Sequence, residues 1–125
     1  MKYLRLKENY LFTGAYSSGK KAVAKRIVLY VMPDKRAELY KRKNPEGEKI
    51  NRVGYTVSKK YGKAVLRNRA KRIMREAYYR LIKENETEKG YIVVICARDA
   101  AKYAKTADVY KDLLYAARQT ELIKK

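Results

Sequence analysis

The segment 58–75 (SKKYGKAVLRNRAKRIMR) combines closely spaced Lys and Arg side chains with an apolar pattern of helical period. At about 100° of rotation per residue, one side of the helix carries an apolar stripe. The stripe consists of Leu66, Ala70, Ile73, Met74, Ala77, Leu81 and Ile82. The opposite side gathers Asn68, Lys71, Arg72, Arg75 and Tyr79, while Arg67 and Arg69 border the stripe. Because guanidinium groups bind phosphate through paired hydrogen bonds, the pattern predicts a helix that contacts an RNA backbone.

The alternative for this helix is a solvated charged face without a partner, which is the usual role of a charge run. Lys71 and Arg75, and also Arg72 and Arg75, lie at helical neighbour spacing. Like charges at that spacing destabilise an isolated helix. A bound polyanion would remove this repulsion, and the pattern therefore favours binding.

The composition indicates a folded basic protein. The chain has 125 residues, with 32 Lys and Arg against 13 Asp and Glu and a formal charge of +19. With 46% hydrophobic residues, it can bury a core, and we expect a single domain spanning 1–125. Nucleic acid and an anionic membrane could both bind a protein of this charge, and the charge alone does not distinguish between these two partners.

Several kinds of site are disfavoured by the residues present. The chain has no His and a single Cys96, which argues against an intramolecular disulfide or a structural zinc site. Acidic residues are scattered rather than clustered, so we expect no catalytic residue and no metal site on the protein. Cys96 lies in the apolar run 91–97 and is expected to be an inert core residue. That run is too short to span a bilayer and the first ten residues lack a signal-peptide core, so we expect a cytoplasmic protein.

The periodicities predict the element order α, β, β, α, β, α. Helices are expected at 7–16, at 63–85 and from a cap at Thr106 onward, and strands at 27–32, 53–57 and 91–97. In the strand 53–57, Gly54 and Thr56 leave the second face unusually bare. The charged connection 34–51 contains the turn sequence Asn-Pro-Glu-Gly and is interpreted as a loop or hairpin tip, with room for one more strand or none.

Residues 52–79 (RVGYTVSKKYGKAVLRNRAKRIMREAYY) closely resemble the signature of the bacterial ribonuclease P protein family. In that signature, a strand ending in VSKK precedes a basic helix opened by Arg-Asn-Arg. The segments LKENYLF, IVLYV and YIVVICAR also occur in the family's order. The resemblance covers most of the chain and is weaker between Met32 and Asn51 and after Lys102. A long motif in its expected structural context is more specific than a lone basic run.

The resemblance implies an α+β fold and a defined activity. The fold would be a single-domain α/β sandwich with a mixed four-stranded sheet, about three helices and a left-handed βαβ crossover, like the second domain of a small-subunit ribosomal protein. The activity would be that of an endoribonuclease subunit that assists removal of the 5′ leader from precursor tRNA. In this family the RNA subunit carries catalysis with divalent metal, Mg²⁺. The implied partners are ribonuclease P RNA and the leader, with neither DNA nor membrane.

The resemblance also assigns residues to two surfaces. The residues assigned to contact with the catalytic RNA are Arg67, Asn68, Arg69, Lys71, Arg72 and Arg75, with Lys59 and Lys60 extending the surface. A shallow cleft between the first helix and the sheet would hold the leader at Phe12, Tyr16 and Tyr30, with Lys25 and Arg26 as nearby cations. Exposed rings can stack on unpaired bases. The alternative is that Phe12 and Tyr16, one helical turn apart, simply pack in the core.

Two other functions share this composition. A ribosomal protein or general RNA chaperone would have the same size and charge but needs no leader cleft. A peripheral membrane protein would need large apolar residues beside its basic face, whereas the stripe from Leu66 to Leu81 is expected to be used in the core.

Overall fold

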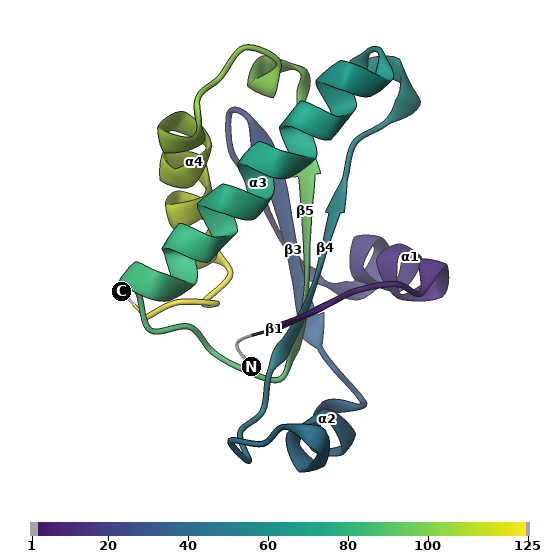
Figure 1. Ribbon diagram of the computed structural model, residues 1–125, viewed down its shortest axis with the longest axis vertical. Coiled ribbons are helices and arrows are strands. Elements are labelled where there is room, and N and C mark those ends of the chain that lie inside the picture. Colours follow the sequence, from purple (N-terminus) through teal and green to yellow (C-terminus); the bar gives the residue numbers. More distant parts are fainter. Residues whose placement is uncertain (1–2, 125) are drawn as a thin grey trace.

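The computed structural model describes residues 3–124 and contains one mixed sheet of five strands (Figure 1). The strands are β1 (Tyr3–Arg5), β2 (Lys20–Val23), β3 (Ile27–Pro33), β4 (Asn51–Thr56) and β5 (Tyr91–Ala97). They lie in the order β1-β4-β5-β3-β2. β4 is parallel to both β1 and β5, whereas β3 is antiparallel to both β5 and β2. The apolar strand β5 therefore lies at the centre of the sheet, as its sequence predicts.

Helices cover both faces of this sheet. They are α1 (Asn9–Ser18), α2 (Ala37–Lys43), α3 (Ala64–Glu84) and α4 (Thr106–Gln119), with 3₁₀ turns η1 (Lys59–Tyr61) and η2 (Asp99–Ala101). α3 and α4 pack against the face that carries Val93 and Ile95, whereas α1 packs against the face that carries Ile92 and Val94. α2 projects beyond one end of the sheet (Figure 1).

The connection from β4 through α3 to β5 is left-handed. In Figure 1, both strands point upward, α3 lies on the viewer's side of the sheet, and β5 lies to the left of β4. Right-handed crossovers are strongly favoured in parallel β-α-β units, so this handedness is uncommon. It confirms the crossover that the family resemblance implied.

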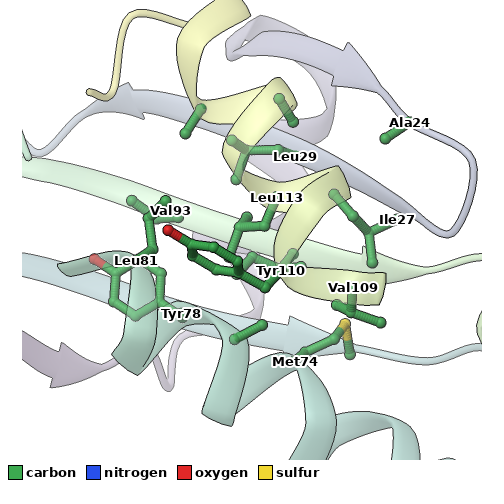
Figure 2. Packing of buried hydrophobic residues seen from close by; sticks show 14 of the residues in the cluster. Ala24, Ile27, Leu29, Met74, Tyr78, Leu81, Val93, Val109, Tyr110 and Leu113 are labelled. Carbon is green, nitrogen blue, oxygen red and sulfur yellow. The ribbon is translucent and has the colours of Figure 1, made fainter. Parts of the chain in front are cut away.

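The main core lies between the sheet and the helices α3 and α4 (Figure 2). The buried residues of α3 are Ala70, Ile73, Met74, Ala77, Tyr78 and Leu81. These include most of the predicted apolar stripe and add Tyr78, which is fully buried. Leu66 and Ile82 are half-buried at the margins. In Figure 2, Met74, Tyr78 and Leu81 point from α3 toward the sheet and α4, so the outer side of the helix is free for polar residues.

The bare face of β4 is explained by the ring of Phe12. A Cβ atom placed on Gly54 would lie 2.3 Å from Cζ of Phe12, which is closer than any real contact of that kind. Only glycine at this position lets α1 lie so close to β4. Ala15 and Leu6 complete this smaller core with residues of β5.

The sheet contains five strands, whereas the resemblance implied four and periodicity predicted three; the two missing from the periodicity are the short edge strands β1 and β2. β1 has three residues and β2 has four, too few for an alternating pattern to be recognised. β2 also begins with Lys20 and Lys21, whose charge is typical of an edge strand. The predicted strand 53–57 in fact begins at Asn51 and ends at Thr56.

Four α-helices replace the three expected. The segment 34–51, interpreted as a loop or hairpin, contains α2, which Tyr40 anchors by placing its ring 4.9 Å from the guanidinium carbon of Arg52. Thr106 is the first residue of α4 and not its cap. The cap residue is Lys105, whose N–H donates to Oδ2 of Asp108 at 3.0 Å.

The contact between Gly54 and Phe12 predicts opposite effects for two alanine substitutions. Gly54→Ala should lower the free energy of unfolding by about 1–3 kcal/mol, because the new methyl group overlaps the Phe12 ring. Gly14→Ala in α1 should raise it by about 0.5–1 kcal/mol, since its Cβ would make an ordinary contact of 3.5 Å with Met32. Urea unfolding measures both, and equal stability of Gly54→Ala and the parent would contradict the assignment.

Candidate nucleic-acid interface

The outer surface of α3 is cationic because its inner side is occupied by the core. Asn68, Lys71, Arg72 and Arg75 are all exposed. Arg72 lies 3.6 Å from Glu76, one turn further along, and both side chains are about half exposed. Exposed pairs of this kind are weak, so an incoming phosphate can compete for Arg72. The structure therefore brings four of the predicted RNA-contacting residues together on one surface.

The other predicted contacts to the catalytic RNA surround the first turn of α3. Lys59 and Lys60 are exposed in η1, directly before the helix. Arg67 is half-buried at the margin of the helix. These side chains extend the cationic surface toward the amino-terminal end of α3.

Arg69 differs from its neighbours because its guanidinium group is already bound within the protein. Its Nη1 donates to the carbonyl of Lys102 at 3.0 Å, and its Nη2 donates to the carbonyl of Ala104 at 2.8 Å. The two bonds attach the segment after η2 to α3. The sequence gave no indication of this role, because the acceptors are main-chain atoms more than thirty residues away.

A groove of about 610 Å³ runs between α1 and α3 across the β1–β4 edge of the sheet. It is lined by Tyr3, Arg5, Leu6, Lys7, Asn9, Phe12, Val53, Gly54, Tyr55, Lys71 and Arg75. Phe12 thus packs partly in the smaller core and also lines the groove, and its contact with a leader stays a prediction. Residues predicted for two separate surfaces, Phe12 and Lys71, line one groove.

On the α1 face of the sheet, two tyrosines form a partly exposed aromatic pair. The ring centroids of Tyr16 and Tyr30 lie 5.0 Å apart at an interplanar angle of 68°. Tyr16 is 44% exposed. The ammonium group of Lys21 lies 5.8 Å from the Tyr30 centroid, and the two residues are cross-strand partners. Lys21 was missed because its strand was not predicted.

Polar groups hold Tyr16 in place against the sheet. Its hydroxyl donates to Oγ1 of Thr56 at 3.2 Å, and Thr56 in turn donates to Sγ of Cys96 at 2.9 Å. Burial raises the pKa of the Cys96 thiol, although its hydrogen bonds with Thr56 and Tyr16 act in the opposite sense. The thiol is therefore kept protonated, in line with the prediction that Cys96 is not a nucleophile.

The two cations predicted beside the cleft lie in the turn between β2 and β3. Lys25 is exposed there. The main-chain N–H of Arg26 donates to Asp112 at 2.9 Å, and its guanidinium lies 3.3 Å from the same carboxylate. Asp112 belongs to α4, which covers the opposite face of the sheet. The structure therefore does not bring the Arg26 side chain together with Tyr16 and Tyr30.

A buried ionic cluster fixes the start of α1. Nε and Nη2 of Arg52 donate to the carboxylate of Asp34 at 2.7 and 2.8 Å, and Nη1 donates to Glu8 at 2.8 Å. Arg52 is only 2% exposed, and Glu8 is the residue that precedes the first turn of α1. The charge of Arg52 is thus satisfied by two carboxylates, one of which places the helix that carries Phe12 and Tyr16.

Comparison with known proteins agrees with this arrangement of a basic helix beside a mixed sheet. The family model described as Ribonuclease P matches residues 1–121. The chain belongs to the ribonuclease P protein family. Its relatives are described as ribonuclease P protein components. One from Caldanaerobacter subterraneus is 41% identical over 97 residues, covering 78% of this chain and 72% of the relative. Another, from Alkaliphilus oremlandii, is 32% identical over 119 residues, covering 95% of this chain and 92% of the relative.

Solved ribonuclease P proteins have the same fold. The protein from Staphylococcus aureus superposes with a TM-score of 0.73 at 25% identity, covering 98% of this chain and all of that one. The Thermotoga maritima protein superposes with a TM-score of 0.66 at 24% identity, covering 92% of this chain and 94% of that one, and supports the fold alone. These similarities confirm the α+β architecture.

As a member of this family, the chain is a protein component of ribonuclease P, an endoribonuclease ribonucleoprotein of tRNA processing, and it partners ribonuclease P RNA. Within residues 3–124, no three His, Cys, Asp or Glu side chains are grouped in a way that could hold a metal ion. No helix in that part of the chain is long and apolar enough to cross a bilayer.

The ion pair at the start of α1 predicts a pH-dependent loss of stability. Partial burial opposes ionisation of Glu8, but the hydrogen bond and charge of Arg52 outweigh it and hold the pKa of Glu8 below its ordinary value of 4.5. A lowered pKa contributes stability above the ordinary value and loses it as the pH falls through the folded-state value. The free energy of unfolding of the parent should therefore exceed that of Glu8→Gln by about 1 kcal/mol at pH 7. This is the contribution of a charge-assisted hydrogen bond, reduced because Glu8 is partly exposed.

This difference should shrink as the pH is lowered from 6 to 3, measured by urea unfolding at each pH. Glu86→Gln removes an exposed carboxylate from the turn after α3 and serves as the control. A difference between the parent and Glu8→Gln that stays constant with pH would contradict the role of the ion pair.

Proposed function

We propose that the outer surface of α3 binds ribonuclease P RNA and that the α1 face of the sheet binds the 5′ leader of precursor tRNA, so that the complex releases the mature 5′ end. One observation carries the proposal: burial of one side of α3 directs Lys71, Arg72 and Arg75 outward together. A rigid array of cations is suited to a folded RNA, whose phosphates are themselves fixed in position.

Binding along α3 would act through phosphates. Asn68, Lys71, Arg72 and Arg75 would form the centre of the contact, and Lys59, Lys60 and Arg67 would extend it past the start of the helix. Neutralising several phosphates releases counterions, which makes the affinity strong and dependent on salt. Arg69 would support this surface through its bonds to the segment after η2.

Leader binding would combine stacking with charge. The Tyr16–Tyr30 pair offers ring surface to unpaired bases without choosing among sequences. Phe12 and the cations Lys71 and Arg75 line the adjoining groove, which gives a path from the α1 face toward α3. Lys21 beside Tyr30 and the exposed Lys25 would contact the leader backbone, whereas Arg26 would act only by holding the β2–β3 turn on α4.

In this proposal, the protein contributes binding and no catalytic group. Divalent metal, Mg²⁺, would be held by the RNA subunit and would activate the attacking water there. Contact with the leader gives the precursor an affinity that mature tRNA lacks, because the mature product has no leader. Charge neutralisation by α3 lowers the concentration of Mg²⁺ needed for the RNA to fold and react.

Reconstitution tests the proposal as a whole. The protein, added to ribonuclease P RNA at low Mg²⁺, should promote cleavage of precursor tRNA at the mature 5′ end. An unrelated basic protein of similar charge is the control. Equal stimulation by that control would support a general RNA chaperone instead.

Removing one phosphate contact should change both affinity and its salt dependence. Arg72→Ala should weaken binding to ribonuclease P RNA and lower the slope of log K against log salt by about one unit. Arg118→Ala removes the same charge from the exposed end of α4 and should leave the slope unchanged. Filter binding at several salt concentrations measures both, and equal slopes for the two variants would count against the assignment of α3.

Removing one stacking ring should affect precursor tRNA alone. Tyr16→Ala should weaken binding of precursor tRNA to the holoenzyme by about tenfold, within the usual range for loss of one base–aromatic stack. Binding of mature tRNA should not change, and Tyr16→Phe should retain most of the affinity. Tyr115→Ala, which removes an exposed ring from α4, is the control. An equal loss for precursor and mature tRNA would exclude the leader as the ligand of this ring.

A further inference from the structure

Tyr103 is the most exposed large apolar side chain in the described part of the chain, at 85%. It lies between η2 and α4, and the nearby Ala101 and Ala104 are buried, at 4% and 7% exposure. Isolated surface rings are common, so exposure alone carries little weight. What distinguishes Tyr103 is the way in which its main chain is held.

The segment that carries Tyr103 is fixed on both sides of the ring. Arg69 donates to the carbonyl of Lys102, the residue before Tyr103, at 3.0 Å and to the carbonyl of Ala104, the residue after it, at 2.8 Å. Turn hydrogen bonds from Lys102 N–H to Asp99 at 3.0 Å and from Ala104 N–H to Ala101 at 3.1 Å add to this. A side chain presented by such a fixed main chain loses little conformational freedom when it binds.

The segment that carries this ring packs beside the surface proposed to bind RNA. The ammonium group of Lys102 lies 5.4 Å from the ring centroid of Tyr61, which places the segment against η1. On the other side, Thr106 donates to Glu76 at 3.2 Å, and Glu76 pairs with Arg72. In Figure 1, the turn after β5 lies at the same end of the molecule as the start of α3.

We propose that Tyr103 stacks on an unpaired base of the RNA bound along α3, with Arg69 as the positioning residue that presents it. The proposal rests on the proposed function of α3. Exposed Lys105 follows the ring by two residues, and exposed Lys59 and Lys60 precede Tyr61, whose ring Lys102 contacts. Lys102 itself lies 3.8 Å from Asp99, so it is the exposed lysines that favour a polyanion over an apolar protein surface as the partner of this ring. Stacking on an exposed ring is how proteins bind unpaired bases without reading their sequence.

Binding of ribonuclease P RNA by Tyr103 variants tests the stack. Tyr103→Ala should weaken binding by about tenfold and leave the salt slope unchanged, because no phosphate contact is lost. Tyr103→Phe should bind like the parent. Tyr115→Ala is the matched control, and thermal unfolding of Tyr103→Ala should match the parent because the ring is exposed.

Parallel measurements with Arg72→Ala separate this proposal from the proposed function. Weaker binding by Arg72→Ala with unchanged binding by Tyr103→Ala would overturn the stack alone, whereas no effect of either would overturn the role of α3. An equal loss in Tyr103→Phe and Tyr103→Ala would point to a hydroxyl contact and overturn stacking. Altered sedimentation of the RNA-free protein by Tyr103→Ala would assign the ring to contact between copies and would also overturn it.

The positioning role of Arg69 has its own readout. Arg69→Met, which removes both donors and keeps a long unbranched side chain, should weaken RNA binding when Tyr103 is present and have a much smaller effect in the Tyr103→Ala background. Losses that multiply independently in the double variant would show that Arg69 does not act through Tyr103.

Discussion

The packing of one side of α3 against the sheet and α4 is the constraint on which the rest of the surface depends. Ile73, Met74, Ala77 and Leu81 are 4% exposed or less, so the helix cannot rotate about its axis without exposing them and burying a guanidinium group. Burial of an unpaired charge costs several kcal/mol. The buried residues of the apolar stripe therefore determine where Lys71, Arg72 and Arg75 point.

Two local contacts position α1, which packs on the opposite face of the sheet from α3. Gly54 lets the Phe12 ring lie directly on β4, and the buried Arg52 binds the carboxylate of Glu8 at the start of α1. Together they hold α1 against β4, beside the groove that residues of α1 and α3 line. The groove thus connects the α1 face, which carries Tyr16 and Tyr30, with the outer surface of α3, although these residues are far apart in the sequence.

Long periodic segments made most of the fold predictable. The strand 91–97 was predicted with its observed bounds, and α3 within one residue at each end, because their apolar patterns are strong. β1, β2 and α2 were missed, since edge strands are short and α2 depends on a tertiary contact between Tyr40 and Arg52. The RNA-binding role that residue type assigns to the side chains of α3 stays a prediction. The partners of Arg26 and Arg69 come from distant segments, and no local pattern reveals them.

Directed hydroxyl-radical cleavage measures most directly whether the outer surface of α3 faces ribonuclease P RNA. Cys96 is the sole cysteine, so Cys96→Ser gives a background in which Asn68→Cys, or Lys111→Cys on α4, carries a single iron chelate. Both positions are exposed. The chelate at position 68 should cut the RNA backbone at a few clustered nucleotides, and the chelate at position 111 should cut it weakly or not at all. Stronger cutting from position 111 than from position 68 would contradict the account.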